Sequence, residues 1–107
     1  MLILFDQGTP VGIREALIGH TVKTAHEQGW SKLTNGELLQ RAELTGFDLL
    51  LTTDKNLVYQ QNLKNRKISI VVLDRNRWSL IQPMLPKIVK TIDIAQPGSY
   101  SLIEISD

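Results

Sequence analysis

Short apolar runs alternate along this chain with segments of helical periodicity, and this alternation limits the folds that it can adopt. Residues 2–5, 47–52 and 68–73 are apolar runs of the kind that strands buried on both faces show. Residues 20–24 form a weaker strand candidate, and residues 100–105 alternate as an edge strand does. The order of these segments predicts a three-layer α/β/α fold with a mainly parallel central sheet, in which the direction of the last strand is left open.

Two of the connecting segments have clear helix signals. Thr9 is expected to be the N-cap and Pro10 the first residue of a helix that continues over residues 11–18 and ends at Gly19. Residues 34–37, Thr-Asn-Gly-Glu, match the capping-box pattern and predict a second helix, which Gly46 ends.

The other connections are less regular. Residues 25–33 have no clear period and are expected to form a loop. A short helix is expected over residues 57–63 and a longer one over residues 79–92. Pro83 and Pro86 lie near the start of the longer helix and should kink it or move its first turn.

Length and composition narrow the class of protein. With 107 residues, the chain is expected to form a single domain over residues 1–107. A net charge of +1 excludes a polybasic arm or an acidic tail, and the absence of cysteine excludes disulfides, thiolate metal sites and a thiol nucleophile. No apolar run approaches the ~20 residues of a membrane span. The first residues read as a buried strand rather than a signal peptide, so we expect a cytoplasmic protein.

Carboxylates gather where the predicted buried strands end. Asp6, Asp54 and Asp74 lie at or near the ends of the first, third and fourth strands. Parallel strands end at one edge, and neighbouring strands are about 4.8 Å apart, so Asp6 and Asp54 can share a cation if their strands are neighbours. Glu37, in the first turn of a helix, overhangs the same edge, whereas Asp74 is expected to be a surface loop residue.

The chemistry of such a cluster favours a hard cation. Carboxylates without a counter-charge repel one another, and a divalent cation removes this repulsion. Ligation by oxygen alone favours Mg²⁺ or Mn²⁺ over zinc, and the two histidines have no ligand spacing. Such an ion can polarise a phosphodiester and activate a water molecule, which is the chemistry of a phosphodiesterase.

Three segments also carry a family resemblance. Phe-Asp-Gln-Gly-Thr-Pro at residues 5–10, Asn-Gly-Glu-Leu-Leu at residues 35–39 and Thr-Thr-Asp-Lys-Asn-Leu at residues 52–57 resemble the three acidic segments of the PIN-like domain family DUF5615. That family is related to the PIN and Mut7-C nuclease domains. The similarity covers about residues 2–75.

The resemblance implies a metal-dependent ribonuclease that acts on single-stranded RNA. It implies that Asp6, Glu37 and Asp54 hold Mg²⁺ or Mn²⁺ and carry catalysis. Such proteins are often the toxin of a toxin–antitoxin pair, with a small helix-turn-helix partner of the DUF433 type.

This chain departs from the family pattern at three positions. Gln7 stands where the family has Glu, and Asn35 and Asn56 stand where it has Asp. Each change removes a negative charge and keeps an oxygen, so one metal is favoured over two.

Polar and basic side chains near this edge are candidates for substrate binding. These side chains are expected to contact the phosphates of RNA. They are Gln7, Asn35, Lys55, Asn56 and Arg75, with Arg77 and Lys23 nearby. A second basic group, residues 64–67, precedes the strand that Arg75 follows, and a strand of this length places the two groups about 20 Å apart.

Other interpretations of the same residues stay open. Asp6 is also compatible with an Asx-turn, Asp54 with a helix cap, and Glu37 with a capping box that turns it away from a metal. Trp30 and Trp78 are expected in the core or a lid rather than stacked on a nucleobase.

Two other functions also fit the sequence. One is a catalytically weakened PIN-like binding module, and the other is a receiver domain with Asp54 as phospho-acceptor. The predicted edge strand over residues 100–105 offers a surface for a homodimer.

Overall fold

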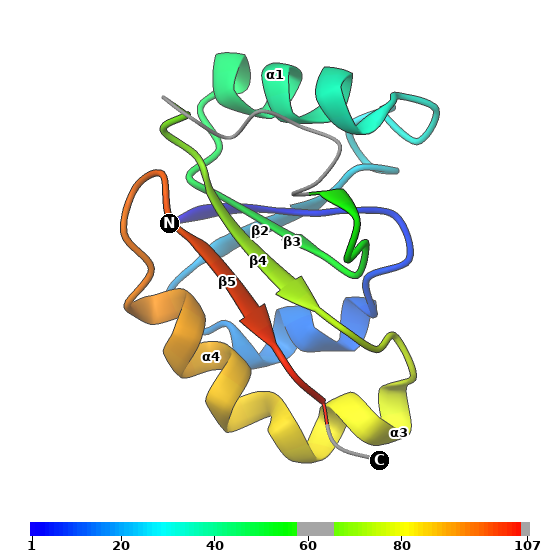
Figure 1. Cartoon of the computed structure of the whole chain (residues 1–107), viewed down its shortest axis with the longest axis vertical. Helices are drawn as coiled ribbons and strands as arrows, with labels where there is room; N and C mark the ends of the chain where they lie inside the picture. Colours follow the sequence, from blue (N-terminus) through cyan, green and yellow to red (C-terminus); the bar gives the residue numbers. More distant parts are fainter. Residues whose placement is uncertain (58–65, 106–107) are drawn as a thin grey trace.

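The computed structural model describes residues 1–57 and 66–105. Five parallel strands form one sheet in the order β2-β1-β3-β4-β5 (Figure 1). The strands are β1 (Leu2–Phe5), β2 (Thr21–Thr24), β3 (Leu49–Thr52), β4 (Ser69–Leu73) and β5 (Tyr100–Ile103). The predicted α/β fold with a parallel sheet is therefore confirmed, and β5, whose direction the sequence left open, pairs with β4 in parallel.

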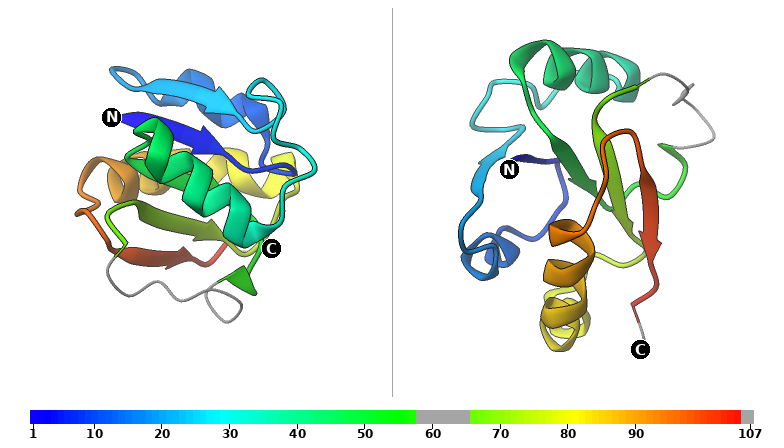
Figure 2. Two further views of the ribbon diagram at one scale, coloured as in Figure 1. Left: turned by 90° about the horizontal axis from the view of Figure 1, so that it is seen from above. Right: turned by 90° about the vertical axis from the view of Figure 1, so that its left-hand side faces the viewer.

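Helices cover both faces of the sheet. Helix α1 (Asn35–Thr45) lies on one face, and α4 (Leu85–Asp93) lies on the other together with the 3-10 helix η1 (Val11–Ala16) (Figures 1 and 2). The short helices α3 (Trp78–Ile81) and η2 (Gln82–Met84) lead into α4. Among the described residues, no helix is both long enough and apolar enough to cross a bilayer.

The alternation of side chains along the strands divides the core into two layers. Ile3, Phe5, Leu49 and Leu51 point toward α4 and η1, where they pack with Ile88 and other residues. The residues between them in sequence point the opposite way, as the two-residue period of a strand requires. This second layer comprises residues of β1, β3 and β4 and of α1, and its members include Leu4, Leu50, Ile70, Val72, Leu38, Leu39 and Ala42.

The capping box predicted at the start of α1 is present. The Thr34 hydroxyl accepts the Glu37 N–H, and the Glu37 carboxylate accepts the Thr34 N–H. Gly46 ends the helix in the left-handed conformation at φ 98°, which glycine adopts without steric cost. Local sequence therefore defines both ends of this helix.

The prediction of a helix over residues 11–18 is wrong in the type of helix and in the residue that caps it. The segment is a 3-10 helix, and Pro10 stands at the N-cap position with no side-chain cap. Thr9 is buried, and its hydroxyl donates to the carbonyl of Leu51 at 3.1 Å. The side chain expected to cap the helix is thus used to hold the loop after β1 against β3.

The remaining connections largely follow their sequence signals. The helix predicted over residues 79–92 is divided into α3, η2 and α4, with Pro83 in η2 and Pro86 in the first turn of α4, so the expected kink is confirmed. The loop predicted over residues 25–33 is confirmed as a series of turns. The helix predicted over residues 57–63 lies outside the described residues apart from Leu57, which is buried.

The two tryptophans pack differently. The Trp30 ring meets Phe47 edge to face at 5.9 Å between ring centroids and belongs to the core layer under α1. Trp78 is 38 % exposed, and the tip of its ring lies directly over Gly12 of η1. A methyl group on Gly12 would lie 2.7 Å from the Trp78 ring, so only glycine allows α3 and η1 to approach this closely.

Gly12→Ala should lower the free energy of unfolding by about 1–3 kcal/mol, because the large Trp78 ring must move to admit the methyl group. Urea unfolding measures this loss. In a Trp78→Ala background the same Gly12 substitution should cost much less, since the clash is gone. Equal costs in the two backgrounds would contradict the contact.

Candidate functional site

The sheet order creates one place where loops leave the sheet in opposite directions. From β1 the chain crosses to β2 on one side, and β3 then pairs with the other side of β1. In parallel sheets, ligands bind beyond the carboxyl ends of the strands at such a switch point. Asp6 directly follows β1, and Asp54 is the second residue after the end of β3, so both aspartates lie at the switch point.

Asp6 is held by its own loop and by β3. Its backbone N–H donates to the carbonyl of Leu51 at 2.9 Å, which extends the β1–β3 ladder by one residue. Its carboxylate accepts the Gln7 N–H at 2.8 Å through Oδ1 and the Thr52 hydroxyl at 2.7 Å through Oδ2. The carboxylate therefore has a defined orientation.

Asp54 is held from three sides. Its Oδ1 accepts the Asn56 N–H at 2.9 Å, and its Oδ2 accepts the side-chain amide of Asn35 at 2.8 Å. Its backbone N–H donates to the Thr52 hydroxyl oxygen at 3.1 Å. Asn35 is the first residue of α1, so this bond joins the helix to the end of β3.

Thr52 connects the two aspartates. Its side chain is fully buried, and its hydroxyl oxygen accepts from Asp54, so its single proton is directed to Asp6. We call Asp6 and Asp54 the acid pair and Thr52 the bridging threonine. Together they form one hydrogen-bonded unit.

The surroundings disfavour a negative charge on Asp6. Burial is the largest influence and raises the pKa of Asp6 above 3.8, and the nearby charge of Asp54 raises it further. The hydrogen bonds from Thr52 and Gln7 lower the pKa and offset part of this rise. A cation at this position would offset the cost of desolvation and the repulsion from Asp54.

Glu37 does not join the acid pair. Its carboxylate belongs to the capping box of α1, and the hydrogen bonds with Thr34 lower the pKa of Glu37. Within residues 1–57 and 66–105, no group of three or more histidine, aspartate or glutamate side chains is close enough to hold a metal ion. The structure therefore brings together two of the three predicted carboxylates.

The donor set of the acid pair fits one hard cation. Among the described residues, each of the four carboxylate oxygens accepts one hydrogen bond, and an oxygen of this type has a second lone pair. Mg²⁺ commonly binds through one or two carboxylates and keeps several waters. Asp6 and Asp54 could hold Mg²⁺ or Mn²⁺ in this way, whereas two metals would need more negative charge.

The other residues predicted to bind substrate occupy two kinds of position. Asn35 and the backbone N–H groups of Gln7 and Asn56 hold the acid pair, so they act on it directly. Lys55 is exposed beside Asp54, and Arg75 is exposed in the loop after β4.

The two basic groups lie at opposite edges of the sheet, as the sequence predicts. Arg75 and Arg77 follow β4, whereas Arg66 and Lys67 precede it. Arg66 forms an ion pair with Glu43 of α1 at 3.0 Å. Asp74 accepts the Ile105 N–H at 2.7 Å and thereby fastens the segment after β5, in line with its expected place in a loop.

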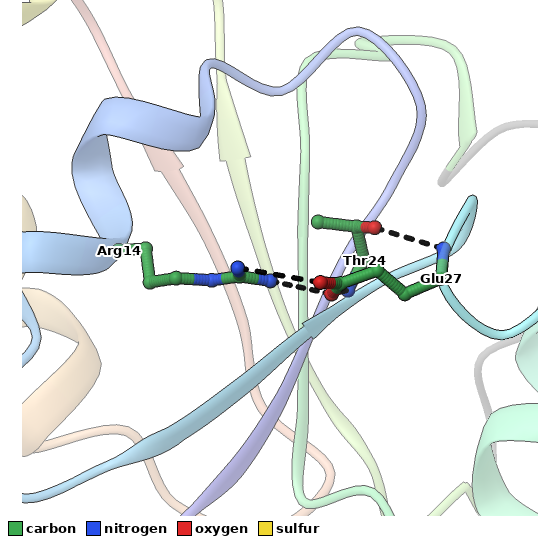
Figure 3. Close-up of polar contacts among 3 residues, drawn as sticks. All are labelled: Arg14, Thr24 and Glu27. Carbon is green, nitrogen blue, oxygen red and sulfur yellow. Dashed lines mark hydrogen bonds and ion pairs between the residues drawn. The ribbon is translucent and has the colours of Figure 1, made fainter.

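An ion pair at the end of β2 was missed by the sequence analysis. The Arg14 guanidinium of η1 binds the Glu27 carboxylate in a bidentate manner, with a shortest distance of 2.5 Å (Figure 3). Glu27 and Thr24 also exchange hydrogen bonds, each backbone N–H donating to the other's side chain. Thr24-Ala-His-Glu27 has the spacing of a capping box, which was the available signal, but turns follow it instead of a helix.

No family model, curated protein or solved structure matches this chain.

Glu27→Gln should destabilise the protein in a pH-dependent manner. The hydrogen bonds from Arg14, followed by that from Thr24, lower the pKa of Glu27 from 4.5 to about 2. Its contribution to stability is therefore present above pH 4.5 and lost as the pH falls to about 2. Urea unfolding across this range should show the wild type and Glu27→Gln converging in acid.

Glu15→Gln is the matched control for this variant. Glu15 is an exposed carboxylate of η1 that forms no ion pair within the described ranges, so its substitution should change stability at neutral pH less. If the difference in free energy of unfolding between Glu27→Gln and wild type does not change with pH, the ion pair is not its cause.

Glu37→Gln separates a capping role from a metal-binding role. Glutamine also completes a capping box, so Glu37→Gln should destabilise α1 less than Thr34→Ala, which should cost about 1 kcal/mol. Calorimetry should give the same Mn²⁺ affinity for Glu37→Gln and wild type. A lost affinity would show that Glu37 leaves the cap to bind metal.

Proposed function

We propose that this protein is an endoribonuclease of PIN-like type that uses one Mg²⁺ or Mn²⁺ ion and cleaves single-stranded RNA in the cytoplasm. The observation that carries the proposal is the acid pair at the β1–β3 switch point. The Asp6 carboxylate and the backbone N–H of Asp54 share the Thr52 hydroxyl, and burial and the nearby charge of Asp54 both raise the pKa of Asp6.

The residues of the chain have separate roles in this proposal. Asp6 and Asp54 hold the ion, which would polarise the phosphodiester and supply an activated water molecule. Thr52 and Asn35 fix the two carboxylates, because each donates a hydrogen bond to one of them. Lys55, exposed beside Asp54, is placed to contact a substrate phosphate.

The resemblance to the PIN-like family supports the same chemistry and extends it to partners. The segments that carry the resemblance include both members of the acid pair and Asn35, which binds Asp54. A small helix-turn-helix antitoxin of the DUF433 type is accordingly the partner that we propose, with this chain as the toxin.

A catalytically weakened binding module is the second candidate. It is favoured by the engagement of Glu37 in the capping box, which leaves two carboxylates at the switch point. In that case the edge would still bind RNA, but it would hold a metal too weakly to cleave it.

A receiver domain is less well supported. Its sheet order, 2-1-3-4-5, is the order found here, so the fold alone does not separate the two functions. Gln7 stands where a receiver has a second acidic residue after its first strand, and Glu104 and Ile105 follow β5 where a receiver has a lysine. These features favour the metal-binding proposal.

Asp6→Asn and Asp54→Asn should each reduce Mn²⁺-dependent RNA cleavage by at least about 100-fold, since loss of a supporting residue alone costs 10–100-fold at metal sites. Thr52→Val, which removes the bridging hydroxyl, should fall within that smaller range. Gel analysis of a labelled single-stranded RNA measures cleavage, and the rise in melting temperature with Mn²⁺ measures binding.

Asp48→Asn is the matched control, because Asp48 lies at the opposite edge and accepts the Leu2 N–H, which asparagine can also accept. It should cleave like wild type. Cleavage that survives in Asp6→Asn would refute the site. RNA binding with neither Mn²⁺ binding nor cleavage in the wild type would favour the weakened module.

The metal affinity should also depend on pH. Protons compete with the metal for Asp6, and the raised pKa of Asp6 makes this competition begin at a higher pH than for an ordinary aspartate. Mn²⁺ affinity, measured by calorimetry, should therefore weaken as the pH falls through that raised value. An affinity that is constant down to the ordinary range of aspartate would exclude Asp6 as a ligand.

A further inference from the structure

A pocket of about 720 Å³ opens at the carboxyl edge of the sheet beside the acid pair. Its lining comes from the ends of β3 and β4 and from α3, and consists of Thr53, Asp74, Arg75, Asn76, Arg77 and Leu80. We name it the β4 pocket. Its volume lies within the range of pockets that hold a small ligand.

The β4 pocket is continuous with the acid pair along the backbone. Thr53 lines it and stands between Thr52 and Asp54, which both belong to that hydrogen-bonded unit. The Thr53 hydroxyl also faces Gly8 of the loop after Asp6, about 3.5 Å from the position of a Cβ atom there. A chain bound at the acid pair therefore needs only to pass Thr53 to enter the β4 pocket.

The charge of the β4 pocket favours an anion. Arg75 and Arg77 contribute two guanidinium groups and Asp74 one carboxylate, which is anchored by the Ile105 N–H. Arg77 is exposed and forms no ion pair within the part of the chain that the structure describes. Guanidinium groups bind phosphate through paired, charge-assisted hydrogen bonds.

The loop that carries these arginines is firmly supported. The Arg77 carbonyl accepts the N–H groups of Leu80 and Ile81, and the Ile81 side chain is fully buried. On the other side, Trp78 rests on Gly12 of η1. A supported binding loop loses little conformational entropy when a ligand binds.

The geometry points to the β4 pocket as the site that holds the phosphodiester backbone of single-stranded RNA on its way from the acid pair. This inference rests on the proposed nuclease function and adds the path of the substrate. A single strand can place consecutive phosphates and an unpaired base in a concave pocket, whereas a duplex offers only its outer phosphates. The basic group at the opposite edge is a poorer candidate, because Glu43 already neutralises Arg66.

Binding is best tested without metal, so that it is independent of cleavage. Fluorescence anisotropy of a short labelled single-stranded RNA in EDTA compares wild type with Arg77→Gln and with Arg75→Gln/Arg77→Gln. We expect about a tenfold loss of affinity for Arg77→Gln and a larger loss for the double variant. The slope of log K against log salt should fall by roughly 0.7 for each phosphate contact removed.

Lys90→Gln is the control, because it removes one positive charge, as Arg77→Gln does. Lys90 is exposed in the last turn of α4, and a hydrogen bond between Asp93 and His20 holds this end of α4 at the start of β2, at the edge opposite the β4 pocket. Lys90→Gln should leave affinity and salt slope unchanged. An equal loss in Lys90→Gln, or unchanged binding in the double arginine variant, would overturn the inference.

Further ligands test the class of occupant. A single-stranded DNA that binds like the RNA would leave the backbone assignment standing without selectivity for ribose. A mononucleotide or an RNA duplex that binds as tightly as the single strand would overturn it. If binding behaves as expected but Mn²⁺ brings no cleavage, the proposed catalysis fails while the β4 pocket stands.

Discussion

The parallel pairing of β1 with β3 is the constraint on which the rest of this molecule depends. Both strands are buried on both faces, so helices must cover the sheet on either side, and the connections have to cross over it. The same pairing places the loops after β1 and β3 side by side. Asp6 even continues the ladder through its bond to Leu51, so the core and the candidate site share one set of hydrogen bonds.

Burial at this junction has a cost that a catalytic role would explain. Asp6 is disfavoured in its charged form by desolvation and by Asp54, although Thr52 and Gln7 partly compensate. Local arrangements that lower stability occur where binding or chemistry needs them. The acid pair gives the carboxyl edge an anionic centre, and Arg75 and Arg77 after β4 add positive charge beside it. This charge pattern would suit a phosphodiester bound to a metal ion.

Several elements were predictable because their signals are local. The capping box of α1 needs only residues 34–37, and the strands β3 and β4 are recognisable from continuous apolar runs. Thr9 and Glu27 show where local reasoning fails. Thr9 bonds to a carbonyl 42 residues away, and Glu27 completes a capping box that no helix follows, so both depend on partners from other elements.

By itself, the sequence determined the alternation of buried strands with helices, and therefore the class of fold and the edge at which Asp6 and Asp54 lie. Only the tertiary structure decided which carboxylates meet there. The Thr52 hydroxyl bonds to the Asp6 carboxylate, 46 residues away in the sequence, and to the backbone N–H of Asp54. The local capping box keeps Glu37 with Thr34. Short-range hydrogen bonds are encoded in adjacent residues, but a shared site forms only when the packed sheet sets the distances between its strand ends.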